Sequence, residues 1–460
     1  MNALIPIWRA AGLPSAALQQ LSLTGREPVL PSSFAVGTAA QASLAAAALA
    51  ATELGRHRNG LQQRVQVDMR EAALECCVHF TIDGRAPEVW DKIAGLYPCQ
   101  GGGWVRLHTN FAHHRDGVLR LLGLPAEPET TREAVAAELL KWRAHDFEDA
   151  AARAGLVVAA LRGLEEWDRH PQSAAVAQDP LVAIEKIGDA AALTWPALPL
   201  HARPLEGLRV LELTRVLAGP VAGRTLAAYG ADVLLVNAPH LPNIEAIIDT
   251  SRGKLSALAD LREAGGRAAL LAVLRDAHVF IQGYRPGALA ALGFAPGDVA
   301  QARPGIVMVS LSAYGESGPW AGRRGFDSLV QTATGINHAE ALAAGAAQPK
   351  PLPMQILDVA TGFLMAFGAQ TALLRQQHEG GSWHVRVSLA RTAQWLRELG
   401  RIENGFNAPG ADFSGLMEPH ACGYGELQAM RHSAVFSDTP ARWTRPSMPP
   451  GSHPLAWPVP

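Results

Sequence analysis

Two aspartates lie at positions where a carboxylate could do chemistry. Asp358 is the one charged residue in LPMQILDVATGF (352–363), at the start of a long helical pattern, and Asp327 precedes another helical pattern in GFDSLVQ. A carboxylate can attack an activated acyl group, and the positive end of a helix dipole favours its ionised form. Aspartate is also a preferred helix N-cap. Both interpretations stay open for both residues.

Other nucleotide and nucleophile chemistries lack their motifs. Gly219 and Gly223 do not form a G-x-G-x-x-G fingerprint, and Asn237 stands where a dinucleotide site would carry an acid. No Walker A or G-x-S-x-G sequence occurs. Three neighbouring histidines lack metal-ligand spacing and are expected at solvated strand and helix ends: His108, His113 and His114. We expect no metal.

The second half of the chain must position these residues. Its sequence pattern is that of alternating strands and helices. Apolar strands are predicted at 208–214, 231–239, 278–284 and 305–315. Helices are predicted at 219–230, 262–277 and 289–293. This alternation predicts an α/β fold with a doubly wound, parallel, Rossmann-like sheet. Its ligand crevice would lie outside the carboxyl ends of the strands.

An internal similarity indicates a partial duplication. Residues 38–73 align with 358–393 without a gap, and each copy has the pattern helix, glycine stop, strand, helix. Asp358 faces Thr38, so only one copy keeps the carboxylate. We predict four regions: an N-terminal arm (1–34), a degenerate first copy with a small α+β domain (35–200), the Rossmann-like domain with the nucleophile (205–400) and an extended C-terminal segment (401–460). Pro196, Pro199 and Pro204 mark a linker over 187–207.

Composition limits the class of protein. The chain has 460 residues, 48% hydrophobic and 18% charged, with a net charge of −2. This favours two or three packed lobes and no nucleic-acid partner. The cysteines lack zinc spacing, which favours core thiols in a reducing compartment: Cys76, Cys77, Cys99 and Cys422. The N-terminus lacks a signal-peptide pattern, and we expect no apolar run to approach the roughly 18–20 residues of a membrane span. We therefore expect a cytoplasmic protein that does not bind membranes.

Four motifs in order resemble the family III CoA-transferases, the superfamily of carnitine CoA-transferase, formyl-CoA transferase and α-methylacyl-CoA racemase. LRVLELTRVLAGPVAGRTLAAYGADVLLV resembles the family's opening, and SRGKLSALADL its N-R-G-K-x-S element. VFIQGYRPGALAALGF resembles its strand before R-P-G, and VSLSAYGESGPWAGRRGFDSLVQTATG its G-Y-G-x-x-G-P block. DVATGFLMAFGAQTALLRQQHEGG resembles the helix that begins with its nucleophile. Residues 35–185 resemble the part that normally follows, so the chain is similar to a fused, partly duplicated member.

The resemblance implies an enzyme that moves CoA from an acyl-CoA thioester to a carboxylic acid. Asp358 would form a mixed anhydride and then an aspartyl-CoA thioester, and Asp327 matches a second catalytic aspartate or caps the helix after it. Coenzyme A would contact the first βα turn at Arg215, Val216, Leu217 and Ala218. Its phosphates would contact Arg252 and Lys254. Its pantetheine would lie near Gly283 and Tyr284. Arg252, Lys254, Gly283 and Tyr284 could equally be plain turn residues. Family members form interlocked dimers, which implies a homodimer here.

Two alternatives remain. Racemases of this superfamily place a histidine before the second aspartate as a proton-transfer partner. Here that residue is Phe326, which favours a transferase over a racemase or isomerase. Asn237, Ala238 and Ala291 depart from residues usual on the CoA side. They motivate the third hypothesis, a non-catalytic member that binds CoA or a partner protein.

Overall fold

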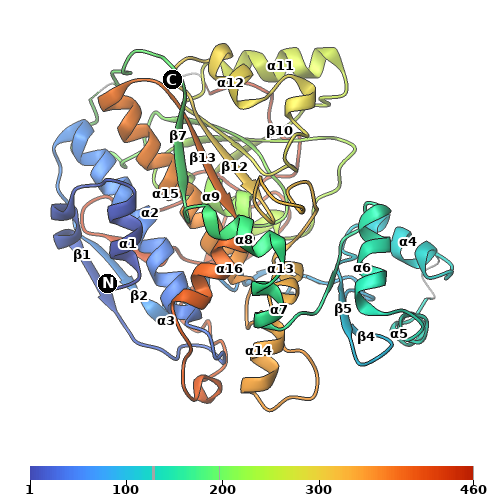
Figure 1. Ribbon diagram of the computed structural model, residues 1–460. Helices are drawn as coiled ribbons and strands as arrows, with labels where there is room; N and C mark the ends of the chain where they lie inside the picture. Colours follow the sequence, from blue (N-terminus) through green and yellow to red (C-terminus); the bar gives the residue numbers. More distant parts are fainter. Residues whose placement is uncertain (127–129, 196, 459–460) are drawn as a thin grey trace.

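A seven-stranded sheet forms the centre of the computed structural model, which describes residues 1–126, 130–195 and 197–458 (Figure 1). In sheet order the strands are β10 (Lys254–Leu258), β9 (Asp232–Asn237), β8 (Arg209–Leu213), β11 (Val279–Gln282), β12 (Val307–Ser312), β13 (Ser382–Ser388) and β7 (Ala183–Gly188). Six strands are parallel, and β7 is antiparallel to β13. The predicted α/β class is confirmed, but the sheet is mixed rather than wholly parallel. Pro196 of the predicted linker and residues 459–460 lie outside the described residues.

Helices cover both faces of this sheet because successive strand residues point to opposite sides. Val210 and Val279 join the larger core, which contains α9 (Ala218–Ala228) and α15 (Ile356–Glu379). Leu211 and Phe280 join a second core with α11 (Ala264–Leu274) and α12 (Pro296–Ala302). Because these strands are buried on both sides, their sequences are near-continuous apolar runs.

The order of the strands reverses between β8 and β11. From β8 the chain proceeds outward through β9 and β10, and then returns to β11, β12 and β13 on the other side. The loops that leave β8 and β11 therefore diverge at their carboxyl ends, where open α/β sheets bind ligands. These loops contain residues 214–217 and 283–284.

The duplicated segments have matching element bounds. Helix α2 (Val36–Asn59) and α15 differ by 320 at both ends, and both are followed by a glycine, Gly60 or Gly380. Strand β2 (Val65–Asp68) and helix α3 (Met69–Glu75) correspond to the end of β13 and the start of α16 (Leu389–Glu398). The two long helices pack on each other, and Gln370 Nε2 donates to the Ala47 carbonyl oxygen at 3.1 Å. One copy therefore covers the other.

Helix α15 is the one described helix long and apolar enough to cross a membrane by length and composition. It has 24 residues and a mean hydropathy of 1.4 over its best window. The expectation that no apolar run approaches this length was therefore wrong. The whole window is buried inside the protein, and a core helix passes the same test.

Strand β10 was missing from the prediction, which assigned no strand to SRGKLSALADL and left a turn open for Arg252 and Lys254. The missing strand matters for the site, because Arg252 and Lys254 lie just before and at its start. Gly223 of α9 faces the same region: a Cβ there would lie 1.8 Å from Glu212 Oε2. That glycine leaves room for a buried ion pair between Glu212 and Lys254 rather than for a phosphate.

The small domain stands to one side of the main body (Figure 1). Its elements are β4 (Gly95–Pro98), β5 (Trp104–Leu107), α4 (Ala112–Leu121), α5 (Arg132–Leu139), α6 (Ala144–Arg153) and β6 (Val158–Ala160). The remaining elements connect or cover the lobes: α1 (Leu4–Ala10), β1 (Leu21–Thr24), β3 (Phe80–Ile82), α7 (Leu164–Asp168), α8 (Pro171–Gln178), α10 (Ile247–Thr250), α13 (Asp327–Ala333), α14 (Ile336–Ala343), β14 (Met417–His420), β15 (Leu427–Met430) and β16 (Ala434–Phe436).

Candidate active site

Asp358 lies in the first turn of α15 but is not its N-cap. Pro353 disfavours helical backbone just before it, and the helix begins at Ile356 with Gln355 as the N-cap. The Asp358 side chain is 7% exposed. No group among the described residues hydrogen-bonds to its carboxylate, which borders two cavities. The interpretation of Asp358 as a helix cap is therefore wrong.

Asp327 holds the beginning of α15 in place. It is the first residue of α13, and its Oδ2 accepts the Asp358 backbone N–H at 2.9 Å. The Leu357 backbone N–H and Gln331 Nε2 also donate to this carboxylate. Asp327 therefore satisfies amides of α15 instead of capping its own helix. This arrangement makes it a positioning residue for Asp358.

Burial raises the pKa of both carboxylates, and the charge of Asp327 adds to this effect at Asp358. Burial raises the pKa of Asp327 to about 6, although its hydrogen bonds act in the opposite direction. Burial, and next the charge of Asp327, raise the pKa of Asp358 well above its ordinary value. The helix end favours ionisation of Asp358, as the sequence suggested, but desolvation and a like charge oppose it. The pair consequently titrates as a unit.

A basic cavity of about 350 Å³ lies on one side of Asp358. Six residues predicted on the CoA side line it: Arg215, Val216, Leu217, Ala218, Gly283 and Tyr284. Arg285, Arg323 and Arg324 add positive charge to its wall. The Arg285 side chain is exposed and has no ion pair or hydrogen bond with any residue that the structure describes. A cavity with such a wall can hold phosphate groups.

The loop after β8 has strained backbone where it borders this cavity. Val216 has a φ of 73°, which a β-branched residue rarely adopts. The turn also brings α9 close to the strand end: a Cβ on Gly219 would lie 2.5 Å from Thr214 Cγ2. Strain of this kind persists where the surrounding structure holds it, and often at ligand sites.

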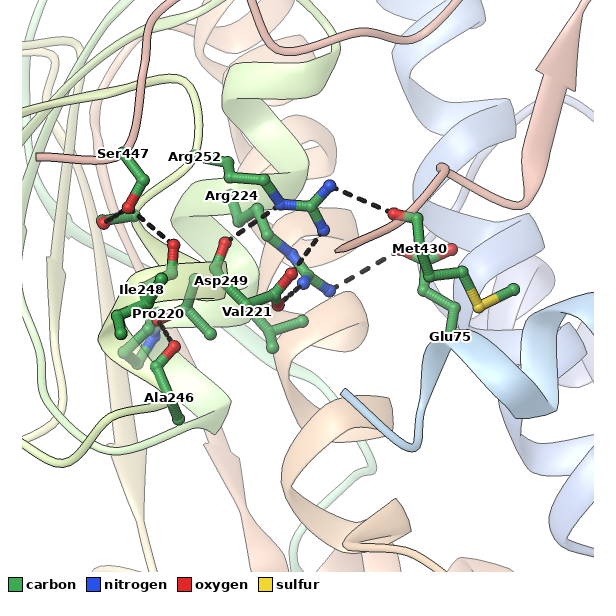
Figure 2. Close-up of polar contacts among 12 residues, drawn as sticks. Glu75, Pro220, Val221, Arg224, Ala246, Ile248, Asp249, Arg252, Met430 and Ser447 are labelled. Atoms are coloured by element: carbon green, nitrogen blue, oxygen red, sulfur yellow. Dashed lines mark hydrogen bonds and ion pairs between the residues drawn. The ribbon is translucent and has the colours of Figure 1, made fainter. Parts of the chain in front are cut away.

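Arg252 and Lys254 do not line the cavity. Arg252 is 1% exposed, and its Nη2 donates to Asp249 Oδ1 at 2.5 Å while Nη1 donates to the Met430 carbonyl oxygen at 3.0 Å (Figure 2). Lys254 Nζ lies 2.8 Å from Glu212 Oε2. Both cations are engaged inside the protein, so the prediction that they contact phosphates does not fit the structure. Their burial follows from strand β10.

A second cavity of about 590 Å³ lies on the other side of Asp358. The two cavities share Val216, Leu217, Phe326 and Asp358. We call the second one the apolar cavity, because carbon-rich side chains predominate in its wall: Cys76, Cys77, Val78, Phe80, Val89, Trp90, Ile244, Ala246, Pro353 and Met354. Asp358 thus stands where a basic cavity and an apolar cavity meet.

Two histidines beside Asp358 were expected in solvent and are buried. His108 is 5% exposed and stacks on Phe326 with 4.0 Å between ring centroids. Its Nε2 is buried without a hydrogen-bond partner, and the ring lines the apolar cavity. His114 is 4% exposed, whereas His113 is exposed, and both line the basic cavity. Desolvation lowers the pKa of His108 and of His114 to about 3.

Sequence reasoning missed Arg285, Arg324 and His108 as site residues. Arg285 and Arg324 stood inside quoted motifs, YRPG and GRRGF, so those motifs were the available signal. No local signal marked His108, because it comes from the small domain and reaches the cavity only through the tertiary fold. Among the described residues, no group of three or more His, Cys, Asp or Glu side chains could hold a metal ion.

Known proteins resemble parts of this chain. Residues 205–400 match CoA-transferase family III. An acyl-CoA transferase of Gibberella moniliformis is 30% identical over 321 residues, 66% of this chain and 56% of that protein. The succinate–glutarate CoA-transferase of Agrobacterium fabrum is 31% identical over 211 residues, 42% of this chain and 52% of that protein. The crystal structure of Rv3272 from Mycobacterium tuberculosis is 33% identical, with a TM-score of 0.40, over 43% of this chain and 56% of that one.

The fold and site define an α/β protein with a carboxylate at its ligand crevice. Residues 205–400 of the chain are similar to CoA-transferase family III. It spans about half the length of the curated relatives that it matches.

Proposed function

We propose that this protein transfers CoA from an acyl-CoA thioester to a carboxylic acid, with Asp358 as the covalent nucleophile. The observation that carries the proposal is the position of its carboxylate, which has no hydrogen bond within the described residues and stands between the basic and the apolar cavity. The match of residues 205–400 to CoA-transferase family III supports the same chemistry. The named activities of the relatives are CoA transfers.

In the proposed steps, each bond that forms is matched by a bond that breaks. The Asp358 carboxylate attacks the thioester carbonyl, the carbon–sulfur bond breaks, and a mixed anhydride and the CoA thiolate result. The thiolate attacks the aspartyl carbonyl of the anhydride, which releases the donor acid and leaves an aspartyl-CoA thioester. The acceptor carboxylate displaces the thiolate to form a second anhydride. Attack of the thiolate on the acceptor carbonyl then yields the new acyl-CoA and restores Asp358.

The basic cavity would hold CoA. Arg285 and Arg324 offer charge to the phosphates, and the exposed backbone at Gly283 allows close approach of the pantetheine. Arg215 stacks on Phe111 at 4.7 Å and donates to the Pro242 carbonyl oxygen, so its guanidinium is held at the rim. Asp327 fixes the first turn of α15, which positions the nucleophile.

A direct test is intact-mass analysis after incubation with acyl-CoA and hydroxylamine, which converts activated aspartyl intermediates to a hydroxamate. We expect modification at Asp358 in the native protein and none in Asp358→Ala. Asp146→Asn is the matched control, because Asp146 is an exposed aspartate of α6, away from both cavities. Modification that persists in Asp358→Ala would refute the assignment.

An acyl-CoA racemase or isomerase is the second candidate, and the position of His108 favours it. The imidazole lies against Phe326, where it can offer the nitrogen that the phenyl ring lacks. Movement of an α-proton needs an acid and a base, which His108 and Asp358 could supply. Incorporation of deuterium at the α-carbon of an acyl-CoA, without CoA transfer, would identify this activity.

Two finer expectations belong to this proposal. We infer that the sheet is doubly wound in the Rossmann-like manner, and the reversal of strand order with helices on both faces supports this. The homodimer implied by the family also remains a proposal. Sedimentation velocity on the full chain would test it, and a species of one chain mass at micromolar concentration would contradict it.

A further inference from the structure

The apolar cavity has an uneven distribution of charge. The ionisable side chains of its wall, apart from His108 and the two cysteines, are all carboxylic acids: the exposed Glu88 and Glu245, Asp91, which pairs with Arg115 at 3.8 Å, and the buried Asp327 and Asp358. The wall contains no lysine or arginine. His108 does not supply a positive charge, because burial lowers its pKa to about 3. Arg106 lies near Asp327 but outside this wall, with its guanidinium over the Trp90 ring at 4.7 Å.

The inner wall is built from hydrocarbon and sulfur. Residues 76–80 come from the first copy, at the end of α3, and Trp90 comes from the connection to the small domain. Ile244 and Ala246 come from the loop before α10, and Met354 from the residues before α15. The first copy thus contributes wall residues to a site whose nucleophile belongs to the other copy. The volume of about 590 Å³ is in the range of small-molecule sites, about 300–1,000 Å³.

We propose that the apolar cavity binds the hydrocarbon chain of a monocarboxylic acyl group and rejects dicarboxylates. This inference rests on the proposed CoA-transferase function and names the substrate class of the same site. The far end of a dicarboxylate would place a second negative charge among carboxylates with no cation on the wall. Such a charge is strongly disfavoured unless it is paired and hydrogen-bonded. An alkyl chain meets no such penalty and gains by leaving water.

The polar contact for the reacting end of the substrate is His108. Its Nε2 is unpartnered, while its Nδ1 faces Ser328 Oγ at 3.5 Å. A neutral imidazole has one donor and one acceptor nitrogen, so Nε2 can complete a hydrogen bond with the acyl carbonyl or the acceptor carboxyl group. Trp90, at 5.7 Å between ring centroids, and Phe326 hold the imidazole from two sides.

The test compares aspartyl modification and transfer rates for hexanoyl-CoA, decanoyl-CoA, succinyl-CoA and glutaryl-CoA with the full chain. We expect kcat/KM for hexanoyl-CoA to exceed that for succinyl-CoA by at least about 100-fold, because no cation on the wall can pair with the second carboxylate. Equal or better use of succinyl-CoA, with Asp358 modified, would overturn the substrate class and leave the proposed function intact. Absence of modification with all four thioesters would overturn the proposed function itself.

A substitution that supplies the missing cation gives a second measurement. Ile244→Arg places a guanidinium on the half-buried loop of the apolar cavity. We expect it to reduce the hexanoyl-to-succinyl ratio by at least about tenfold, since a charge-assisted hydrogen bond contributes about 1.5–3 kcal/mol. Leu342→Arg is the matched control, because Leu342 is 69% exposed and lines neither cavity. Unchanged ratios in a folded Ile244→Arg protein would contradict the placement of the acyl chain.

Discussion

The backbone N–H of Asp358 donates to Asp327 Oδ2 at 2.9 Å, so a carboxylate from α13 fixes the first turn of α15. Asp327 thereby has two opposite effects on Asp358. It orients the main chain that carries Asp358, and its negative charge raises the pKa of the Asp358 carboxyl group. Position and charge can be separated by substitution, because asparagine keeps an oxygen acceptor and loses the charge.

Asp327→Asn should move the pH dependence of transfer to lower pH. The nucleophile must be ionised, so kcat/KM rises with pH as Asp358 loses its proton. Removal of the neighbouring charge lowers the pKa of Asp358, and the acid limb of the profile follows it. Asp327→Ala removes both charge and acceptor, so we expect a lower rate at every pH and a lower Tm. An acid limb that stays in place in Asp327→Asn would show that the two carboxylates are not coupled.

Asp358→Asn should abolish aspartyl modification and stabilise the fold above acidic pH. The pKa of Asp358 is raised in the folded state, so between the ordinary and the raised pKa the folded protein holds a proton that the unfolded chain has released. The free energy of unfolding therefore falls as pH rises through that window. Asparagine lacks this titration, and we expect a gain of about 0.5–2 kcal/mol above the window. Urea unfolding at pH 5 and pH 8 would measure it, and an equal gain at pH 3 would contradict the cause.

The sequence predicted the elements with strong periodicity and missed the partners that tertiary structure brings together. The βαβ unit at 208–239 and the duplicated helices were predictable because long apolar repeats specify them. The role of Arg252 and Lys254 was not, since they lie just before and at the start of a five-residue strand that the sequence analysis did not predict. His108 approaches Asp358 across about 250 residues of chain, and no local pattern encodes such a contact.

The first copy keeps the geometry of the nucleophile without its chemistry. Thr38 is the counterpart of Asp358, and its backbone N–H donates to Glu27 Oε1 at 2.7 Å. A carboxylate thus fixes the first turn of α2 just as Asp327 fixes that of α15. Glu27 lies 11 residues before Thr38, whereas Asp327 lies 31 before Asp358, so alignment of the copies could not reveal the equivalence. A carboxylate that accepts an amide of the first helical turn is present in both copies, and the aspartate within that turn in one.

Arg285→Ala should weaken CoA binding without affecting stability. The guanidinium is exposed at the basic cavity and has no protein partner among the described residues, so its loss removes only contacts with ligand. A charge-assisted contact of about 1.5–3 kcal/mol corresponds to an increase of about 10- to 100-fold in KM for acyl-CoA. The Tm should stay unchanged. A normal KM would remove Arg285 from the CoA site.

Arg252→Met should give the opposite result, a loss of stability with little change in KM of the folded protein. Arg252 and Arg224 both pair with Asp249, and Arg224 Nη2 lies 3.6 Å from Glu75 Oε1 of the first copy (Figure 2). Removal of one cation leaves buried carboxylate charge less compensated, which typically costs about 3–5 kcal/mol. Urea unfolding and steady-state kinetics on the same sample separate the two effects. A raised KM with normal stability would return Arg252 to the CoA site.

His108→Phe should lower the rate for every acyl donor while keeping the order of preference among them. The phenyl ring preserves the stack on Phe326 and removes the buried, unpartnered nitrogen of a residue that lines the apolar cavity. Loss of a hydrogen bond to the reacting group reduces kcat/KM by about 10- to 100-fold. The hexanoyl-to-succinyl ratio should stay the same, because His108 contacts the end of the substrate that all donors share. His201→Phe is the matched control, since His201 is exposed and lines neither cavity. An unchanged rate in His108→Phe, with native Tm, would show that the imidazole only fills space beside Phe326.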